Sequence, residues 1–262
     1  MHHQIDSLAY TNHLRSLPPS HKVGFAIALF MLGFVSWMGV QGAIAIWLAI
    51  WIICYAGIPA KIYGQLLLIP LTFWLLSVPA LILGISFSGN VNTADIAWGS
   101  RYFYLSQQGI SQVQIILMRA IALSSCLYFI LLTTPFADIL NLLKVWRFPT
   151  IIIELLALMY RFIFVLTDTV LELITAQKSR LGYHNRRSQL RSLGIIVSQL
   201  LWRTLENYRA CSLGLISRGF NGELRFWSDR EYQANSRYLK EALVGYGLLL
   251  LLAIFPYIER NI

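Results

Sequence analysis

The amino-acid sequence predicts an all-α integral membrane protein with about five transmembrane helices and two long cytoplasmic helices. Of the 262 residues, 57% are hydrophobic and 13% are charged, and the mean hydropathy is +0.60. This composition is too apolar for a water-soluble domain of the same size. The charge is also uneven, because most of the Lys and Arg residues fall between Thr133 and Lys240. This asymmetry predicts a membrane part and a basic cytoplasmic part.

Five apolar stretches are long enough, or nearly so, to cross a bilayer. Their lengths run from about 14 to 22 residues, against the roughly 20 residues of helix that cross ~30 Å of hydrocarbon. The first two are short, so we expect them to be tilted, paired or extended by their flanks. The five predicted spans are residues 23–40, 43–56, 66–87, 113–132 and 242–258.

A sixth apolar segment, residues 151–173, carries a stripe of charges. Glu154, Arg161, Asp168 and Glu172 recur at intervals of seven, seven and four, which places them on one helical face. Burying each charged group in lipid costs about 2.5 to 3.5 kcal/mol on insertion scales. An amphipathic helix at the cytoplasmic boundary keeps the stripe wet or paired, so we expect this helix not to span the membrane.

The predicted spans divide the chain into three segments of one integral unit. Residues 1–132 hold the amino-terminal membrane helices, residues 133–240 the cytoplasmic helices and residues 241–262 the carboxy-terminal membrane helix. In this arrangement Arg15 and Lys22 lie on the same side as the basic segment. The positive-inside rule therefore predicts a cytoplasmic amino terminus and an external carboxy terminus.

Two long helices fill most of the basic segment. Pro149 sets the start of the first, residues 150–180, and Gly219 suits the C-cap of the second, residues 188–218, with residues 183–187 as the link. We expect the two helices to pack together, antiparallel or crossed, and to offer both C-terminal ends to the same side. The packing face predicted for the second helix consists of Leu190, Leu193, Ile196, Val197, Leu200, Leu201, Leu205 and Tyr208.

Both long helices end in a small residue followed by arginine. Ser179-Arg180-Leu181 ends the first, and Ser217-Arg218-Gly219 ends the second, 38 positions later. One interpretation is that each arginine complements the helix dipole, which contributes roughly 0.3–1 kcal/mol. The repetition favours another, in which each helix end enters a groove on a second protein and the guanidinium binds carboxylates there. Helix ends of this kind would transmit force.

The chain carries no recognisable catalytic or cofactor motif. We find no glycine-rich phosphate loop, no Ser-His-Asp or Cys-His arrangement and no His/Cys cluster at zinc spacing, so we expect no catalytic residue, no cofactor and no metal site. His2 and His3 leave open a terminal copper or nickel site, although lone terminal histidines are usually solvated. His184 is interpreted as polar surface. We expect no nucleic acid as a partner, because the arginines alternate with apolar residues next to a membrane.

The cysteines and one intramembrane arginine have simpler interpretations. The cysteines are odd in number and widely spaced, which indicates packing residues: Cys54, Cys126 and Cys211. Arg119 falls within the fourth predicted span, where we expect it to pair with a polar neighbour or to contact a partner protein. The candidate neighbours are Gln112, Gln114 and Ser124.

Several segments together resemble a known family over nearly the whole chain. The amino-terminal part contributes residues 5–12, Leu14-Arg15 and residues 18–22. The later part contributes Val145-Trp146-Arg147-Phe148-Pro149, residues 160–166, Ala176-Gln177, residues 179–183 and Ser217-Arg218-Gly219-Phe220-Asn221-Gly222. These segments resemble the transmembrane T component of energy-coupling factor transporters and are most similar to its cobalt-type branch, CbiQ.

The resemblance implies a scaffold in the inner membrane of a prokaryotic cell that joins two ABC-type ATPases to a substrate-binding integral membrane subunit. The family's two Ala-Arg-Gly motifs, which dock on the ATPases, correspond here to Ser179-Arg180-Leu181 and Ser217-Arg218-Gly219. Both copies have Ser in place of Ala, and the first has Leu in place of Gly. The resemblance also implies that cobalt, or nickel, is the transported ion and that the long helices are cytoplasmic coupling helices. This chain would hydrolyse nothing itself.

A self-contained membrane permease or channel for a small ion is the alternative. It would use Arg119 and the polar loop of residues 86–108. Such a transporter should carry paired acids or histidines within its spans, and the five predicted spans carry none. A membrane enzyme is disfavoured because the catalytic residues are missing.

Overall fold

The computed structural model describes residues 2–86, 96–98, 101–105, 107–219, 232 and 236–259. The chain divides into two compact units, which are described separately. The first unit consists of Met1–Asp138 and Arg230–Ile262, and the second of Ile139–Asp229. The boundaries predicted at residues 132 and 240 concern the membrane surface, which these two units do not mark, so they remain predictions.

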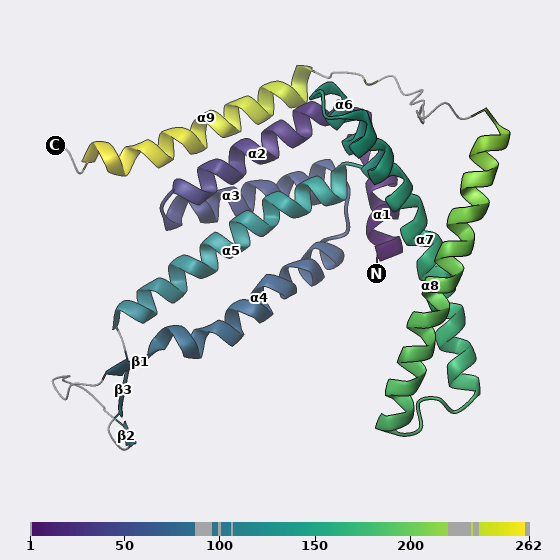
Figure 1. Cartoon of the computed structure of the whole chain (residues 1–262). Coiled ribbons are helices and arrows are strands. Elements are labelled where there is room, and N and C mark those ends of the chain that lie inside the picture. The colour runs from purple at the N-terminus through teal and green to yellow at the C-terminus, as the bar shows by residue number, and fades with distance from the viewer. Residues whose placement is uncertain are drawn as a thin grey trace. The chain divides into compact units, whose positions relative to one another are not determined.

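The first unit is a bundle of membrane-type helices (Figure 1). Its helices are α1 (His2–Thr11), η1 (His13–Ser16), α2 (Pro19–Val35), α3 (Met38–Ile50), η2 (Trp51–Tyr55), α4 (Ala60–Ile82), α5 (Gln107–Thr133) and α9 (Ser236–Glu259). α3 continues into η2, a turn of π-helix, without a break. The short helix α6 (Phe136–Val145) begins at the end of this unit.

Among the described residues, four helical segments are long and apolar enough to cross a membrane. They are Met38–Tyr55, Ala60–Ile82, Ser111–Thr133 and Thr150–Ser179, and Pro19–Val35 is a shorter apolar helix. These segments confirm the predicted all-α membrane class. The last of them is the charged helix that we expect not to span, so its length and composition alone would also allow a span.

The first two predicted spans have the wrong boundaries. The chain leaves the helix at Ser36 and Trp37, whose backbones are extended, and Val40 belongs to the second helix. Side chains make this break possible within apolar surroundings, because the Gln41 amide donates to the carbonyls of Gly33 (3.1 Å) and Ser36 (2.9 Å). The apolar residues on both sides hide the break from a hydropathy reading.

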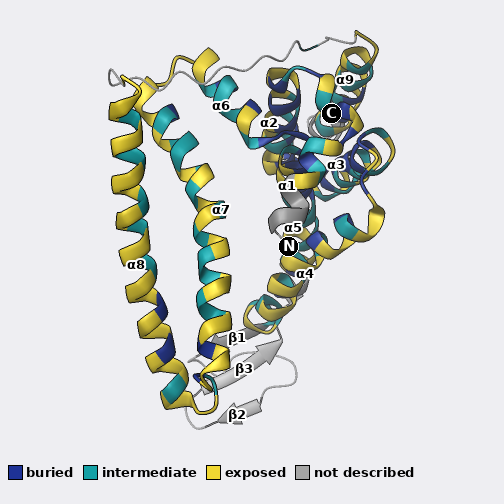
Figure 2. Cartoon of the chain, turned by 90° about the vertical axis from the view of Figure 1, so that its right-hand side faces the viewer, coloured by how far each residue is buried: buried dark blue, intermediate teal, exposed yellow. Residues whose placement is uncertain are grey.

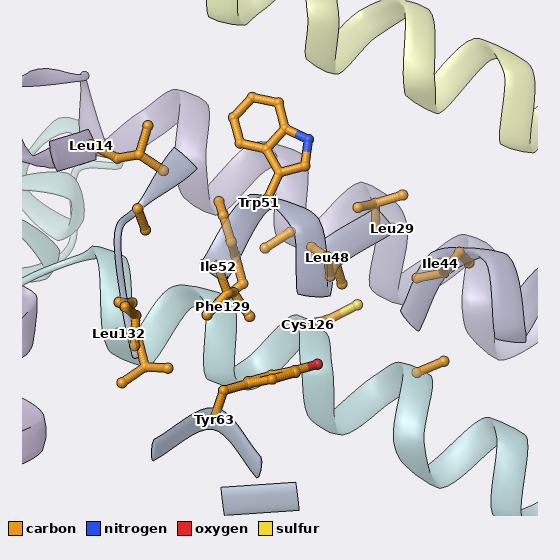
Figure 3. Close-up of a cluster of buried hydrophobic side chains, with 14 of the residues drawn as sticks. Leu14, Leu29, Ile44, Leu48, Trp51, Ile52, Tyr63, Cys126, Phe129 and Leu132 are labelled. Carbon is orange, nitrogen blue, oxygen red and sulfur yellow. The ribbon is translucent and has the colours of Figure 1, made fainter. Parts of the chain in front are cut away.

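The core of the first unit lies between α2, α3, η2, α4 and α5 (Figure 3). Leu29, Leu48 and Ile52 are fully buried, and Phe129 is 2% exposed. The ring of Phe25 lies 5.5 Å from that of Trp51 and 5.8 Å from that of Phe129, measured between centroids. Interlocked aromatic rings of this kind fix the relative positions of the helices that carry them.

The predicted loop of residues 86–108 contains a small antiparallel sheet. Its strands are β1 (Leu83–Ser86), β2 (Ile96–Trp98) and β3 (Arg101–Leu105), in the order β1-β3-β2. Ile85 pairs with Phe103 on one side, and Ile96 pairs with Phe103 on the other. The aromatic run of β3 favours a strand. The predicted third span therefore ends earlier than expected, at Ile82, where α4 gives way to β1.

The second unit is built on a helical hairpin of α7 (Thr150–Ser179) and α8 (Arg186–Ser217), joined by residues 180–185 (Figure 2). The two predicted long helices are confirmed within two residues at each end. The hairpin is antiparallel, because Ser192 near the start of α8 donates to Gly182 just beyond α7, whereas Arg203 lies beside Glu172.

The predicted packing face of α8 is largely wrong. Ser192 and Ile196 are its buried residues, and Figure 2 shows most of the remaining helix exposed. Partly buried positions continue the face at intervals of three or four: Ser188, Leu200, Thr204, Asn207, Cys211 and Leu215. Small and polar residues therefore face α7, while Leu193, Leu201 and Tyr208 are 52%, 62% and 65% exposed. Small side chains let two helices approach closely, which is why hydrophobicity alone selected the wrong face.

Candidate functional site

The two arginine-tipped helix ends have the same backbone conformation. Arg180 follows the last residue of α7 at φ −93° and ψ 17°, and Arg218 follows the last residue of α8 at φ −95° and ψ 11°. The next residue is left-handed in both, with φ 56° at Leu181 and 72° at Gly219. The leucine that replaces glycine in the first motif therefore does not change the shape of the helix end.

Matching hydrogen bonds close both ends. The backbone N–H of Arg180 donates to Gln177 at 3.2 Å, and that of Arg218 donates to Leu215 at 3.1 Å. The N–H groups of Leu181 and Gly219 donate to the carbonyls three residues earlier, at 3.1 and 3.0 Å. Such bonds tighten the last turn and satisfy carbonyls that a helix end leaves open.

The serines of both motifs are bound to their own helices. The Ser179 hydroxyl donates to the carbonyl of Thr175 at 3.1 Å, and the Ser217 hydroxyl to that of Gly214 at 3.0 Å. Each serine thus adds little bulk and directs its polar hydrogen inward. The arginine is left as the side chain that projects from each end.

Both arginine side chains are exposed. In the described part of the chain, neither the Arg180 nor the Arg218 guanidinium has a hydrogen bond, ion pair or aromatic ring as a partner. By contrast, Arg203 on the same hairpin pairs with Glu172 at 3.3 Å. A guanidinium offers a planar fork of donors that matches a carboxylate, so both ends are suited to bind acidic groups on another molecule.

The surroundings of the two ends differ. Beyond Leu181, Gly182 is buried, its N–H donates to Gln177 at 2.9 Å, and its carbonyl accepts from Ser192 at 3.0 Å. A side chain at Gly219 would meet no described atom within 4 Å. The first end is therefore fastened to α8, while the second is open around its glycine.

The structure does not bring Arg180 and Arg218 together. In an antiparallel hairpin, α8 starts beside the end of α7 and carries Arg218 to the opposite end. The 32 residues of α8 span about 48 Å at 1.5 Å per residue. The expectation that both C-terminal ends face the same side is therefore wrong, because the antiparallel arrangement separates them.

The charged stripe of α7 stays at the surface of the second unit. Arg161, Asp168 and Glu172 are exposed, and Glu154 is half-buried. Glu172 forms an ion pair with Arg203, which agrees with the expectation that the charges of this stripe are solvated or paired. The exposed Arg161 and Asp168 would have to lie in lipid if α7 crossed the membrane.

The other candidate residues form no recognisable site. Among the described residues there is no group of three or more His, Cys, Asp or Glu side chains that could hold a metal ion. His184 is exposed in the turn after α7. The side chains of His2 and His3, and the residues Phe220, Asn221 and Gly222 of the second motif, lie outside the described part. The three cysteines are free thiols: Cys54, Cys126 and Cys211.

Arg119 does not pair with the polar neighbours expected for it. Its guanidinium lies 5.8 Å from the ring centre of Phe34, a cation–π contact, and its buried Nε has no hydrogen-bond partner among the described residues. The other expectation for Arg119, a contact with a partner protein, stays a prediction.

A buried polar cluster in the first unit was missed by the sequence analysis. Lys22 is 4% exposed and donates to the carbonyl of Thr133 at 3.1 Å, and the Asn12 amide donates to the same carbonyl at 3.3 Å. Asp138, 2% exposed, accepts from the Tyr232 hydroxyl at 2.9 Å. This cluster ties α1 and α2 to the end of α5 and ties Tyr232 to the start of α6. Residues 94 to 121 positions apart make these contacts, so spacing along the sequence gave no signal.

Comparison with known proteins identifies the family. The sequence model described as "CbiQ: Cobalt transport protein" matches residues 11–227. Cobalt transport protein CbiQ of Rhodobacter capsulatus is 32% identical over 228 residues, covering 86% of this chain and 88% of that protein. Its counterpart in Salmonella typhimurium is 25% identical over 222 residues, covering 84% of this chain and 97% of that protein.

A third relative joins two transport proteins in one chain. The protein of Methanocorpusculum labreanum provisionally named fused cobalt transport protein CbiMQ is 29% identical over 224 residues, covering 84% of this chain and 37% of that protein. These matches include both helix ends and all four candidate spans, and they confirm the resemblance expected from the motifs. The chain belongs to the CbiQ family of cobalt transport proteins, as a multi-pass membrane component of a transport system.

Proposed function

We propose that this chain is the coupling subunit of an ATP-driven cobalt transporter of the energy-coupling factor type. In this role it joins two ABC-type ATPases to a substrate-binding integral membrane subunit and has no catalytic activity of its own. ATP binding and hydrolysis in the ATPases move α7 and α8, and these helices pass the movement to the substrate subunit. Cobalt is proposed from the names of the relatives, and the fused CbiMQ relative supports a second membrane subunit as a partner.

The observation that carries the proposal is the pair of matching helix ends. Helix capping alone would account for an arginine at either end, but it does not require the same left-handed residue next to it or a guanidinium without a partner among the described residues. The separation of about 48 Å along α8 also suits two receptors better than one. We therefore assign Ser179, Arg180 and Leu181 to one ATPase and Ser217, Arg218 and Gly219 to the other.

The proposed orientation places the amino terminus and the coupling helices in the cytoplasm and the carboxy terminus outside. The ATPases need ATP, so the two helix ends must lie on the cytoplasmic side. In a chain without other accessible cysteines, a cysteine at position 187 should be protected from an impermeant reagent in intact cells, and one at position 92 should react. Asn92 and the carboxy-terminal Ile262 lie outside the described residues. Equal labelling at positions 187 and 92 would reject the orientation.

Copurification tests the coupling assignment. Arg180→Glu combined with Arg218→Glu puts repulsive charges where carboxylates are expected, so the ATPases should be lost from the purified complex while the chain still inserts. Arg191→Glu combined with Arg209→Glu is the matched control, because it makes the same charge change at exposed sites within α8 that belong to neither arginine-tipped end. Equal ATPase recovery from both double variants would remove the assignment.

Arg119 is the observation that favours the alternative, a self-contained permease or channel. A guanidinium inside a membrane helix that contacts an aromatic ring is a feature of ion pathways as well as of protein contacts. Purified chain in liposomes should show no cobalt flux without its ATPases if the coupling proposal is right. Flux that depends on Arg119 in the chain alone would support the permease.

A further inference from the structure

A cavity of about 400 Å³ lies in the first unit between α2 and α9. Gly24, Phe25 and Ala28 line it from α2, and Leu243 and Tyr246 line it from α9. Trp51 and Phe129 of the core add to this almost entirely apolar lining. The volume is within the range of sites that hold small organic ligands, roughly 300 to 1,000 Å³.

The two helices that enclose the cavity start at the same end of the bundle. Near their starts, Phe25 of α2 and Tyr238 of α9 both contact Trp51, at 5.5 and 6.3 Å between ring centroids. Further along, Gly245 of α9 packs against Trp47, one turn earlier in α3. α9 therefore runs in the same direction as α2, and Figure 1 shows the two side by side.

The apolar part of the cavity extends along α2 from its start towards the middle of the bilayer. The distance from Ser20 to Ala28 along the helix is about 12 Å at 1.5 Å per residue. Gly24 lies midway, and a Cβ added there would meet no atom within 4 Å. An elongated apolar cavity of this kind excludes water and accepts apolar molecules. The apolar molecules that surround a membrane helix are lipid acyl chains.

The end of the cavity at the helix starts is polar and positively charged. Ser20, His21 and Lys22 line it, and the first turn of α2 lacks a side-chain cap on its N–H groups. Lys22 uses one donor on the carbonyl of Thr133, whereas an ammonium group has three. The start of α9 brings Lys240 to the same end. Two helix N-termini and these basic side chains together attract an anion.

Two acids lie at the same end and are already engaged. The buried Asp138 lies near Lys22 and accepts from the Tyr232 hydroxyl at 2.9 Å, so it offsets the charge of Lys22 and leaves Lys240 to supply the net positive charge. Glu241 of α9 accepts from Arg237 at 3.1 Å, so this pair contributes no net charge. The cavity therefore combines an apolar slot with a cationic entrance. An amphiphile with an acyl chain and an anionic head fits both features.

We propose that the cavity between α2 and α9 is a binding site for an anionic glycerophospholipid. One acyl chain fills the apolar part beside Gly24 and Ala28. The phosphate lies at the starts of α2 and α9, near Ser20, His21 and Lys22. This site does not depend on the proposed coupling function, since it requires only a bilayer containing anionic lipid.

Filling the cavity is the first test. Gly24→Leu places a side chain in the open space without a clash, and Gly42→Leu is the matched control, because Gly42 lies in α3 and its Cβ would also meet no atom within 4 Å. Phospholipid that stays bound through detergent purification should be counted per chain by mass spectrometry. We expect Gly24→Leu to lose this tightly bound lipid and Gly42→Leu to retain it. Retention by both, or loss by both, overturns the proposal.

A second measurement uses the unaltered chain and needs no variant to fold. A phosphatidylglycerol with a photoreactive group on one acyl chain should form adducts concentrated on residues 14–28 and 238–246, and a matching phosphatidylcholine should form fewer. Adducts of both lipids spread equally over α4 would mean a general lipid shell and would reject the site.

The same experiment distinguishes lipid from a partner helix. A photoreactive amino acid at position 24, in membranes that contain the whole transport system, should yield a lipid adduct. A crosslink to another protein there would show that a partner occupies the cavity and would overturn the proposal. His21→Glu should reduce the preference for phosphatidylglycerol, with His184→Glu in the second unit as the control. An unchanged preference would remove the head-group assignment.

Discussion

The two units of the molecule treat their large apolar side chains in different ways. The first unit buries Leu48, Ile52 and Phe129 in its own core. The apolar residues that it exposes, such as those of α4, lie in a helix whose one charged residue, Lys61, is near its start, so lipid can cover them. In the second unit, Leu201 and Tyr208 are exposed on a helix that also carries several arginines. Lipid alone cannot cover that surface without burying charge. The difference supports the proposal that the hairpin contacts other proteins.

The largest effect should come from truncating the core of the first unit. Phe129→Ala removes a ring that is 2% exposed and packs against Phe25 and Trp51, so it should cost about 3–5 kcal/mol of stability. Leu201→Ala, at a site 62% exposed, should cost less than about 0.5 kcal/mol. Thermal unfolding of the purified chain in detergent measures both. Similar losses of stability in the two variants would contradict the difference in packing between the two units.

Truncating a buried residue at the contact between α7 and α8 should give the next largest loss of stability. Ile196 is 6% exposed, and Ile196→Ala should cost about 2–5 kcal/mol. Val197→Ala, one residue later and 60% exposed, is the control. Hydrogen exchange of α7 and α8 should speed up in the first variant only. Equal hydrogen exchange in both variants would mean that α8 packs through the face predicted from hydrophobicity.

The buried polar cluster should give a smaller effect on the first unit. Tyr232→Phe removes the hydroxyl that donates to the buried Asp138, and a buried acceptor that loses its donor costs about 1–3 kcal/mol. Tyr246→Phe, on α9, should change the unfolding temperature less. If the two variants have the same unfolding temperature, the hydrogen bond from Tyr232 to Asp138 does not stabilise the first unit.

The smallest effect concerns the left-handed residues at the two helix ends. A side chain at φ 56° costs roughly 1–2 kcal/mol relative to glycine, so Leu181→Gly should slow hydrogen exchange in the turn after α7 by relieving that cost. Gly219→Leu should do the opposite after α8, where φ is 72°. Changes of the same sign at both ends would contradict the matching geometry.

Hydropathy and capping signals placed most of the helices correctly. Pro149 and Gly219 marked ends that the structure confirms, because proline lacks a backbone donor and glycine accepts a left-handed φ. The break between the first two spans was predicted at residues 41–42 and lies at Ser36 and Trp37, because it depends on the side-chain amide of Gln41, which donates to the Ser36 carbonyl. A hydropathy profile does not include side-chain hydrogen bonds.

The candidate site was predictable in part for a related reason. Arg180 and Arg218 stood out by repetition along the chain, but their separation depends on the antiparallel packing of α7 and α8. That packing is carried by Ser192 and other small residues, which carry little hydropathic signal. The backbone shape at Leu181 is likewise fixed by the contacts of Gly182, not by the preference of leucine itself.

ATP-driven cobalt uptake by the Arg180→Lys, Arg218→Lys double variant tests the central claim most directly. Lysine keeps the positive charge that a helix dipole favours, but it lacks the planar fork that binds carboxylates. If both arginines dock on ATPases, uptake into cells should fall to the level seen without ATPases, with normal amounts of the chain in the membrane. If the arginines only cap their helices, the variant should take up cobalt as the unaltered protein does, and that result would contradict the coupling function.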